Sequence, residues 1–252
     1  MEQHNPHVTH KWARFAVIAL TVLVAGCVPR ESPVAQPAIT RTVDLSHVVR
    51  EDVPYLPNEP HTQIRRDADG TIRYLQIGAR TGTLLRIIAA PGASPATVEQ
   101  LSPRDLVLPA VVIDVRDRAQ DQAGYRFSAD ELGDWERRNG RVPQDALVLL
   151  VTGWDMRWGD PGAYLDLDSA GRSQAPAFSD EVATTLLEER GAMGLGIDAP
   201  GTPFMPASGY RLLLENLTNL EQLPPTGATV VVGALKIQAA QTSPARVIAL
   251  IH

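Results

Sequence analysis

Runs of apolar residues alternate with amphipathic segments along most of the chain, which is the pattern of a layered α/β domain. Five apolar runs have the length of strands, at residues 107–115, 145–151, 193–197, 229–235 and 246–251. We expect these runs to be buried strands, because continuous aliphatic segments suit strands that are covered on both faces. The pattern predicts the strands without giving their order in a sheet.

Two amphipathic segments carry the end signals of helices. Residues 128–138 begin with the Ser-x-x-Glu spacing of a capping box and are followed by Asn-Gly, which suits a helix end. Residues 179–190 begin with Ser-Asp-Glu, which places acidic side chains near the positive end of the helix. Residues 67–70, Asp-Ala-Asp-Gly, predict a turn between two extended segments. Strands alternating with two helices indicate a layered domain of the α/β or α+β class, and we take the α/β class as the prediction.

A different apolar run, residues 15–25, follows Lys11 and Arg14 near the N-terminus. A charged start, a short apolar core and small residues before a cleavage site are features of a secretory signal peptide. The run is short for crossing a hydrocarbon core of ~30 Å, which disfavours the alternative of an uncleaved membrane anchor. We therefore expect residues 1–26 to be a signal peptide.

The sequence Leu-Val-Ala-Gly-Cys at residues 23–27 resembles the lipobox of bacterial lipoproteins. Cys27 would then carry the lipid and become the mature N-terminus. Residues 27–42 contain three prolines among small and polar residues and predict a semi-extended tether. These features predict an exported protein, lipid-anchored in the bacterial cell envelope, whose domain spans residues 43–252.

Composition narrows the classes of function. The 252 residues allow one sizeable domain, and the net charge of −6 disfavours a nucleic-acid partner. Cys27 is the only cysteine, so a disulfide, a cysteine zinc site and a catalytic thiol are all excluded.

Several short motifs follow one another along the chain: Val-Asp-Leu-Ser-His at 43–47, Thr-Gly-Thr at 81–83, Pro-Ala-Val-Val-Ile-Asp at 109–114, Thr-Gly-Trp at 152–154, Gly-Leu-Gly-Ile-Asp at 194–198 and the run from Glu215 to Pro224. In this order they resemble the cyclase family of metal-dependent hydrolases, the family of bacterial kynurenine formamidase. The resemblance covers about residues 43–251. It implies a swivelling β/β/α fold, a homo-oligomer, zinc or manganese, and hydrolysis of an amide or lactam-type C–N bond by metal-bound water.

The metal-binding stretch departs from the family pattern, His-Thr-Gly-Thr-His-x-Asp-x-Pro-x-His. Arg80 and Leu84 stand where the resemblance places two histidine ligands, and Arg86 stands where it places the aspartate. Ala90 takes the place of the catalytic histidine, and Glu215 is the one ligand position retained. Guanidinium and alkyl groups do not ligate divalent cations, so no metal cofactor is expected.

The substituted residues suggest a different use of the same pocket. Arg80 or Arg86 could pair with Glu215, or both could reach solvent while backbone donors satisfy the carboxylate. Trp154 and Trp158, together with Tyr164, could line a pocket in which the arginines capture a small anionic ligand. Ordinary packing in the core is the alternative for the tryptophans.

Few other groups could support catalysis. Asp198 and Glu215 are weak candidates for a general base, although Asp198 could instead cap a turn. His47 is better explained as a structural hydrogen-bonding residue, and His61 as a loop or pocket-rim residue. His252 ends the chain.

We therefore predict a catalytically degenerate, cyclase-family lipoprotein, a pseudoenzyme in the standard metal mechanism. Three alternatives stay open: a small anionic-ligand binding module of the cell envelope, a metal-free hydrolase, and an envelope scaffold. A collapsed pocket filled by Leu84, Ile87 and Ile88 would favour the scaffold.

Overall fold

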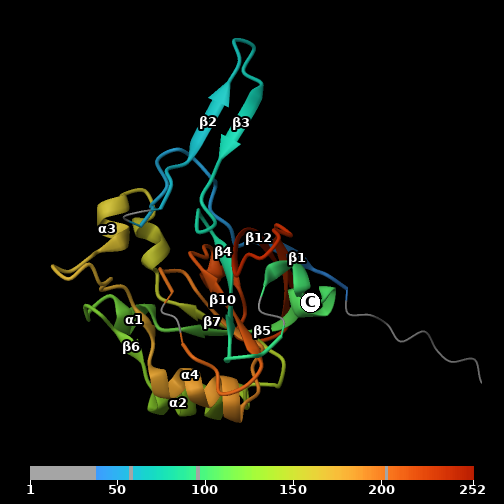
Figure 1. Ribbon diagram of the computed structural model, residues 1–252. Coiled ribbons are helices and arrows are strands. Elements are labelled where there is room, and N and C mark those ends of the chain that lie inside the picture. Colours follow the sequence, from blue (N-terminus) through green and yellow to red (C-terminus); the bar gives the residue numbers. More distant parts are fainter. Residues whose placement is uncertain (1–37, 57–58, 95–96, 202–203) are drawn as a thin grey trace, which may run out of the picture. The chain divides into compact units, whose positions relative to one another are not determined.

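Seven strands close into a barrel-like ring, and an eighth strand attaches to its outside (Figure 1). The computed structural model describes residues 38–56, 59–94, 97–201 and 204–252. The ring follows the order β12-β11-β5-β7-β9-β10-β4 and closes by pairing of β4 with β12, while β1 flanks β12. These strands are β1 (Arg41–Asp44), β4 (Leu84–Ala89), β5 (Val107–Asp114), β7 (Leu147–Val151), β9 (Gly194–Ile197), β10 (Tyr210–Glu215), β11 (Ala228–Ala234) and β12 (Thr242–Ile251).

The long strand β12 makes closure possible because its two ends have different partners. Its first residues pair with β4, where Thr242 lies opposite Arg86, and its last residues pair with β1. Strands β5, β7, β9 and β10 run parallel to one another, and the remaining pairs of the sheet are antiparallel.

Alternate residues of the strands fill two separate cores. One core lies inside the ring and contains, among others, Leu85, Leu149 and Leu214. The other core lies on the outer face, where Leu150 and Ile197 pack with residues of the helices. Because both faces are covered, the strands read as nearly continuous apolar runs.

The helices of the outer layer begin as their sequences predict. Helix α2 (Ala129–Asn139) starts at Ser128, whose side chain and that of Glu131 form the expected capping box. Helix α4 (Asp180–Thr184) starts at Ser179 and continues as the π-helical turn η4 (Thr185–Glu189). The shorter elements are α1 (Arg116–Ala119), α3 (Pro161–Leu165), η1 (Val98–Gln100), η2 (Pro103–Leu106), η3 (Trp154–Arg157), η5 (Leu220–Gln222), β6 (Arg126–Phe127) and β8 (Ala177–Phe178).

A hairpin of two strands projects from this body (Figure 1). Strands β2 (Gln63–Arg66) and β3 (Ile72–Gln76) flank the predicted turn and pair with each other. We call residues 63–76 the arm.

The five predicted strands are all present, and β12 begins four residues earlier than the apolar run at 246–251. Strands β4 and β10 carry no comparable expectation from the sequence. In the described part of the chain, no helix combines the length and apolar character that a membrane span requires. The predicted signal peptide, Cys27 and the tether up to residue 37 lie outside the described residues.

Candidate functional site

The register of β4 and β10 brings Arg86 and Glu215 onto one face of the sheet. Glu215 lies opposite Leu84, and Leu213 lies opposite Arg86. Residues directly opposite each other in an antiparallel pair share a face, and diagonal neighbours lie within reach of long side chains. Arg86 can therefore extend along the sheet towards the Glu215 carboxylate.

Two arginines surround that carboxylate. Arg86 Nη2 lies 2.5 Å from Glu215 Oε1, and Arg80 Nη2 lies 3.9 Å from Oε2. The backbone N–H of Gly201 donates to Oε2 at 3.1 Å. A second carboxylate lies on the other partner: Glu59 Oε1 is 4.0 Å from Arg80 Nη1. Of the two alternatives left open by the sequence, the structure has the guanidinium–carboxylate contact, in a cluster of two cations and two anions.

Burial determines the electrostatics of this charge cluster. The Glu215 side chain is 2% exposed and that of Arg86 is 13% exposed. Burial raises the pKa of Glu215, and the two arginines oppose that rise. Burial lowers the pKa of Arg86, and the Glu215 charge opposes that effect. A guanidinium does not lose its proton in proteins, so a neutral Glu215 would leave Arg86 as a buried cation without a counter-ion. We therefore take Arg86 and Glu215 as an ionised pair.

Three atoms of the charge cluster make no hydrogen bond despite their burial: Arg80 Nε, Arg86 Nη2 and Glu215 Oε1. The close approach of Arg86 to Glu215 is therefore an attraction of charges without hydrogen-bond alignment. Unsatisfied buried polar atoms are rare in folded proteins and require an explanation. The charge cluster can still accept a polar partner.

A small cavity of about 30 Å³ opens beside the charge cluster. Tyr55 and Tyr164 line it, together with Leu84. Tyr55 is 38% exposed, and its ring lies 3.9 Å from the ring of His61, so an aromatic pair stands at the rim. The enclosed space admits a group of about the size of a water molecule or two. Its other lining residues are Pro54, Leu56, Glu59, Arg80, Leu165, Pro200, Glu215 and Asn216.

The side chains of this site are not suited to bind a divalent metal ion. Zinc and manganese need several imidazole, carboxylate or similar ligands converging on the ion. Here Leu84 offers an alkyl group, and Arg80 and Arg86 offer only N–H donors with positive charge. Among the described residues, no three His, Cys, Asp or Glu side chains gather closely enough to hold a metal. Arg86 instead places a positive charge directly against Glu215.

The retained Thr81-Gly82-Thr83 stretch shapes the loop that leads into β4. The Thr83 hydroxyl accepts from the His47 backbone N–H at 3.0 Å and donates to the Asn216 carbonyl at 2.5 Å. The Asn216 amide donates to the Gly82 carbonyl at 2.7 Å. Gly82 has a φ of +71°, which favours glycine. These contacts are structural, so the stretch can persist where the metal ligands do not.

Trp154 and Trp158 belong to the outer core, and neither lines the cavity beside Glu215. The Trp154 indole N–H donates to the Tyr164 carbonyl at 2.8 Å, and Trp158 stacks on His47 with ring centroids 4.0 Å apart. Of the three aromatic residues proposed from the sequence, Tyr164 lines the cavity and the two tryptophans do not; Tyr55 is the other aromatic residue of its lining.

Asp198 lies at the end of β9 with both carboxylate oxygens occupied. The backbone N–H groups of Thr152 and Gly153 donate to Oδ2 at 2.9 and 2.7 Å, and the Thr152 hydroxyl donates to Oδ1 at 2.5 Å. Burial raises the pKa of Asp198 to about 7, against the lowering effect of these hydrogen bonds. Asp198 does not line the cavity, and its contacts fix the turn after β7.

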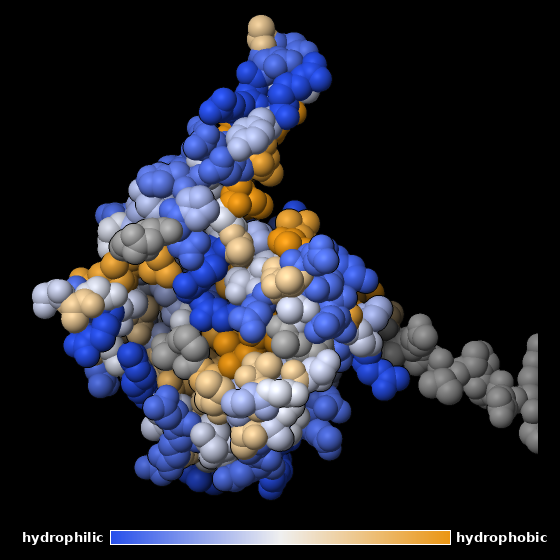
Figure 2. Space-filling model, viewed as in Figure 1, coloured by the Kyte–Doolittle hydropathy of each residue, from blue (hydrophilic) through white to orange (hydrophobic). Residues whose placement is uncertain are grey.

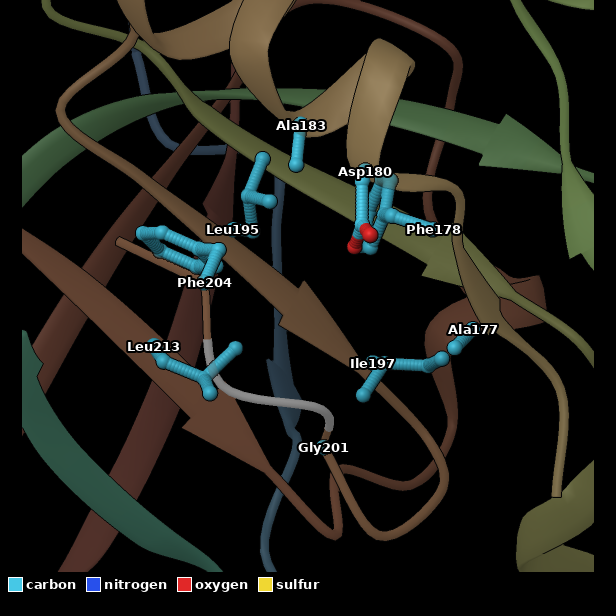
Figure 3. Close-up of a pocket in the computed structure, with 9 residues that line it drawn as sticks. All are labelled: Ala177, Phe178, Asp180, Ala183, Leu195, Ile197, Gly201, Phe204 and Leu213. Carbon is cyan, nitrogen blue, oxygen red and sulfur yellow. The ribbon is translucent and has the colours of Figure 1, made fainter. Parts of the chain in front are cut away.

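Gly201 also lines a second, mainly apolar pocket (Figure 3). The side chains of Leu195, Ile197, Phe204 and Leu213 surround it. A Cβ atom at position 201 would lie 2.6 Å from the Cγ of Glu215, so only glycine lets the loop approach the carboxylate this closely. The free volume is about 10 Å³, which corresponds to about one water molecule.

Residues 43–203 match the model of a family described as "Putative cyclase". The chain therefore belongs to this cyclase family.

Its relatives include isatin hydrolases. The isatin hydrolase of Roseibium aggregatum is 27% identical over 240 residues, which cover 83% of this chain and 91% of that protein. Isatin hydrolase A from Ralstonia solanacearum is 29% identical with a TM-score of 0.74, covering 84% of this chain and 92% of that one. Isatin hydrolase A from Labrenzia aggregata, bound to benzyl benzoate, is 28% identical with a TM-score of 0.75, covering 84% and 93%. The chain is thus an isatin hydrolase-like member of the family.

Three contributors to the site carried no recognised sequence signal. Glu59 and Tyr55 lie in a proline-rich loop, and a single acidic or aromatic residue in such a loop has no periodic pattern to mark it. Gly201 follows Pro200 and reads as an ordinary turn. Glu59 contacts Arg80 and Gly201 contacts Glu215, whereas Tyr55 lines the cavity beside them; all three roles depend on residues that lie far apart in the sequence.

Proposed function

We propose that this protein binds a small aromatic carboxylate at Arg80, and that the metal-dependent hydrolysis typical of its family does not operate in it. The observation that carries the proposal is the contact of Arg86 with Glu215 at 2.5 Å, because a cation of the chain occupies the position of the lost metal charge. The chain would act as a binding module of the cell envelope, anchored through Cys27.

Arg80 is the arginine that remains accessible to a ligand. Its side chain is 34% exposed, and its contacts with Glu59 and Glu215 are loose, at 4.0 and 3.9 Å. A guanidinium in this state can take a carboxylate in a two-point contact, for which arginine is well suited. The ring of the ligand would lie at the rim, against Tyr55 and His61.

The relatives support the choice of ligand class. Two of the similar isatin hydrolase structures are bound to benzyl benzoate and to the product analogue thioisatinate. Relatives of this chain therefore bind aromatic molecules, and the guanidinium of Arg80 would add a preference for negative charge. A metal-free hydrolase receives less support, because the oxygens of Asp198 are fully hydrogen-bonded and Glu215 is paired with Arg86.

Isothermal titration of the purified chain with benzoate, with thioisatinate and with the neutral isostere benzamide tests this function. We expect the carboxylates to bind and benzamide not to. The Arg80→Gln variant should weaken carboxylate binding about 10- to 100-fold, as expected for loss of a charged hydrogen bond. The exposed Arg50→Gln variant is the matched control and should bind normally. Equal affinity for benzoate and benzamide, or normal binding by Arg80→Gln, would refute the proposal.

A further inference from the structure

A groove lies where the neighbouring strands β5 and β7 end. The two strands are parallel, and their last residues, Asp114 and Val151, lie opposite each other. Ligands of open α/β sheets bind outside the carboxyl ends of parallel strands. Residues of α2 and η5 complete the groove, whose volume is about 330 Å³, against about 30 Å³ beside Glu215. Of the described residues, none lines both spaces, so the groove is separate from the charge cluster.

Part of the lining of the groove is apolar and held in place by the core. Leu220, Leu223 and Trp135 line it and are buried. The Trp135 indole N–H donates to the Val112 carbonyl at 3.1 Å, so the polar atom of this side chain is already satisfied. Ligand pockets combine apolar walls of this kind with a few polar groups that orient the ligand. This part of the groove fits an aliphatic side chain.

One cation of the lining is available to a ligand. Arg138, in the last turn of α2, donates from Nε to the Asp134 carbonyl at 3.1 Å. In the described part of the chain, neither of its Nη atoms has a hydrogen-bond or ion-pair partner. Asp114, which also lines the groove, is already bound by Arg116 at 2.7 to 3.1 Å. The free N–H groups of Arg138 suit a carboxylate.

The lining also holds two oxygen acceptors that are open to a ligand. The Glu221 carboxylate makes no hydrogen bond or ion pair with the described residues. Asn139 donates from Nδ2 to the Trp135 carbonyl at 3.0 Å, which leaves its Oδ1 atom as an acceptor. An ammonium group carries three N–H donors and no acceptor, so oxygens of this kind can hold it.

The groove therefore offers a cation, an anion and an apolar surface to the same small molecule. We propose that it binds a free α-amino acid with an apolar side chain. The carboxylate of the ligand lies on Arg138, its ammonium group at Glu221 and Asn139, and its side chain on Leu220 and Leu223. Because both charges of the ligand are read, a simple carboxylate such as benzoate is a poor ligand here.

Isothermal titration of the full-length chain in mild detergent with L-leucine tests this site. L-leucinamide lacks the carboxylate and N-acetyl-L-leucine lacks the ammonium group, so each should bind at least about tenfold more weakly than L-leucine. Arg138→Gln should weaken the binding of L-leucine by a similar factor. Glu221→Gln should reduce the preference for L-leucine over N-acetyl-L-leucine.

Arg65→Gln is the matched control, because it removes the same charge from an exposed residue outside the groove. Arg65 belongs to the arm, which projects from the body and is mostly hydrophilic towards its tip (Figure 2). This variant should bind L-leucine as the wild type does. Unchanged circular dichroism of the groove variants would show that their fold is intact.

Arg80→Gln should also bind L-leucine normally, so this proposal and the proposed function fail independently. Three results would overturn the amino-acid site: no affinity of the wild-type chain for L-leucine tighter than about 1 mM, equal affinity for L-leucine and L-leucinamide, or normal binding by Arg138→Gln. Loss of L-leucine binding in Arg80→Gln alone would place the ligand beside Glu215 and would equally overturn it.

Discussion

Replacing Arg86 by Met is expected to lower the free energy of unfolding by about 3 kcal/mol at neutral pH, the lower end of the range for breaking a buried ion pair. The variant leaves the Glu215 carboxylate, which is 2% exposed, with the Gly201 N–H at 3.1 Å and the more distant Arg80 guanidinium at 3.9 Å. An uncompensated buried charge costs more than the pair contributes when both partners are present. Urea denaturation monitored by circular dichroism measures the change.

A double-mutant cycle isolates the pair. Glu215→Gln keeps an acceptor for the Gly201 N–H, so the double variant Arg86→Met, Glu215→Gln should recover about 2 kcal/mol relative to the sum of the single variants. The exposed pair of Asp114 and Arg116 is the control, with side chains 47% and 40% exposed. Arg116→Met should cost at most about 1 kcal/mol. Additive effects at Arg86 and Glu215 would contradict the ion pair.

Acid is expected to destabilise the fold through His47. Burial lowers the pKa of His47 from 6.5 to about 4, and the charge of Asp155 opposes that shift. The imidazole stacks on Trp158, and its Nε2 atom makes no hydrogen bond. Below pH 6.5 the unfolded chain binds a proton that the folded chain does not, so stability falls as the pH drops from about 6.5 towards 4.

The size of this loss is about 2–3 kcal/mol, from the difference between the two pKa values. Other groups titrate over the same range, so the measurement compares the wild type with His47→Phe, which keeps a ring against Trp158 and cannot take a proton. The free-energy difference between the two chains should change by that amount between pH 7 and pH 4. A constant difference would show that the pKa of His47 is the same in the folded and the unfolded chain, which would contradict the prediction.

The sequence predicted local elements better than their assembly. The capping box at Ser128 and the apolar run of β5 are local signals, and both elements are present. Strand β4 carried no such expectation, because its pattern is interrupted by Arg86, whose partner Glu215 lies far away in sequence. Ring closure by β12 is also non-local, since the same strand pairs with β4 at one end and β1 at the other.

The candidate site, like the fold, could be predicted from the sequence only in part. Positions matched to the family placed Arg80, Arg86 and Glu215 near one another, and the structure brings them together. The same matching suggested that Trp154 lines the pocket, whereas in the structure its indole N–H donates to the Tyr164 carbonyl in the core. An aromatic side chain can serve a pocket or a core equally well, and only the packed structure distinguishes the two.

The cavity also bears on the scaffold alternative. Leu84 does line the small space beside Glu215, whereas Ile87 belongs to the core inside the ring and Ile88 packs against the outer core. The space is small, and one of its lining residues, Arg80, has a side chain that is 34% exposed. That combination favours a binding role over a surface without a pocket.

The most direct test of the account is the metal content of the purified chain, measured by mass spectrometry together with hydrolysis of isatin and N-formylkynurenine. An isatin hydrolase prepared in parallel is the positive control. We predict far less than one zinc or manganese ion per chain, and no turnover when either metal is added. One tightly bound ion per chain with metal-dependent turnover would contradict the claim that Arg86 has replaced the metal beside Glu215.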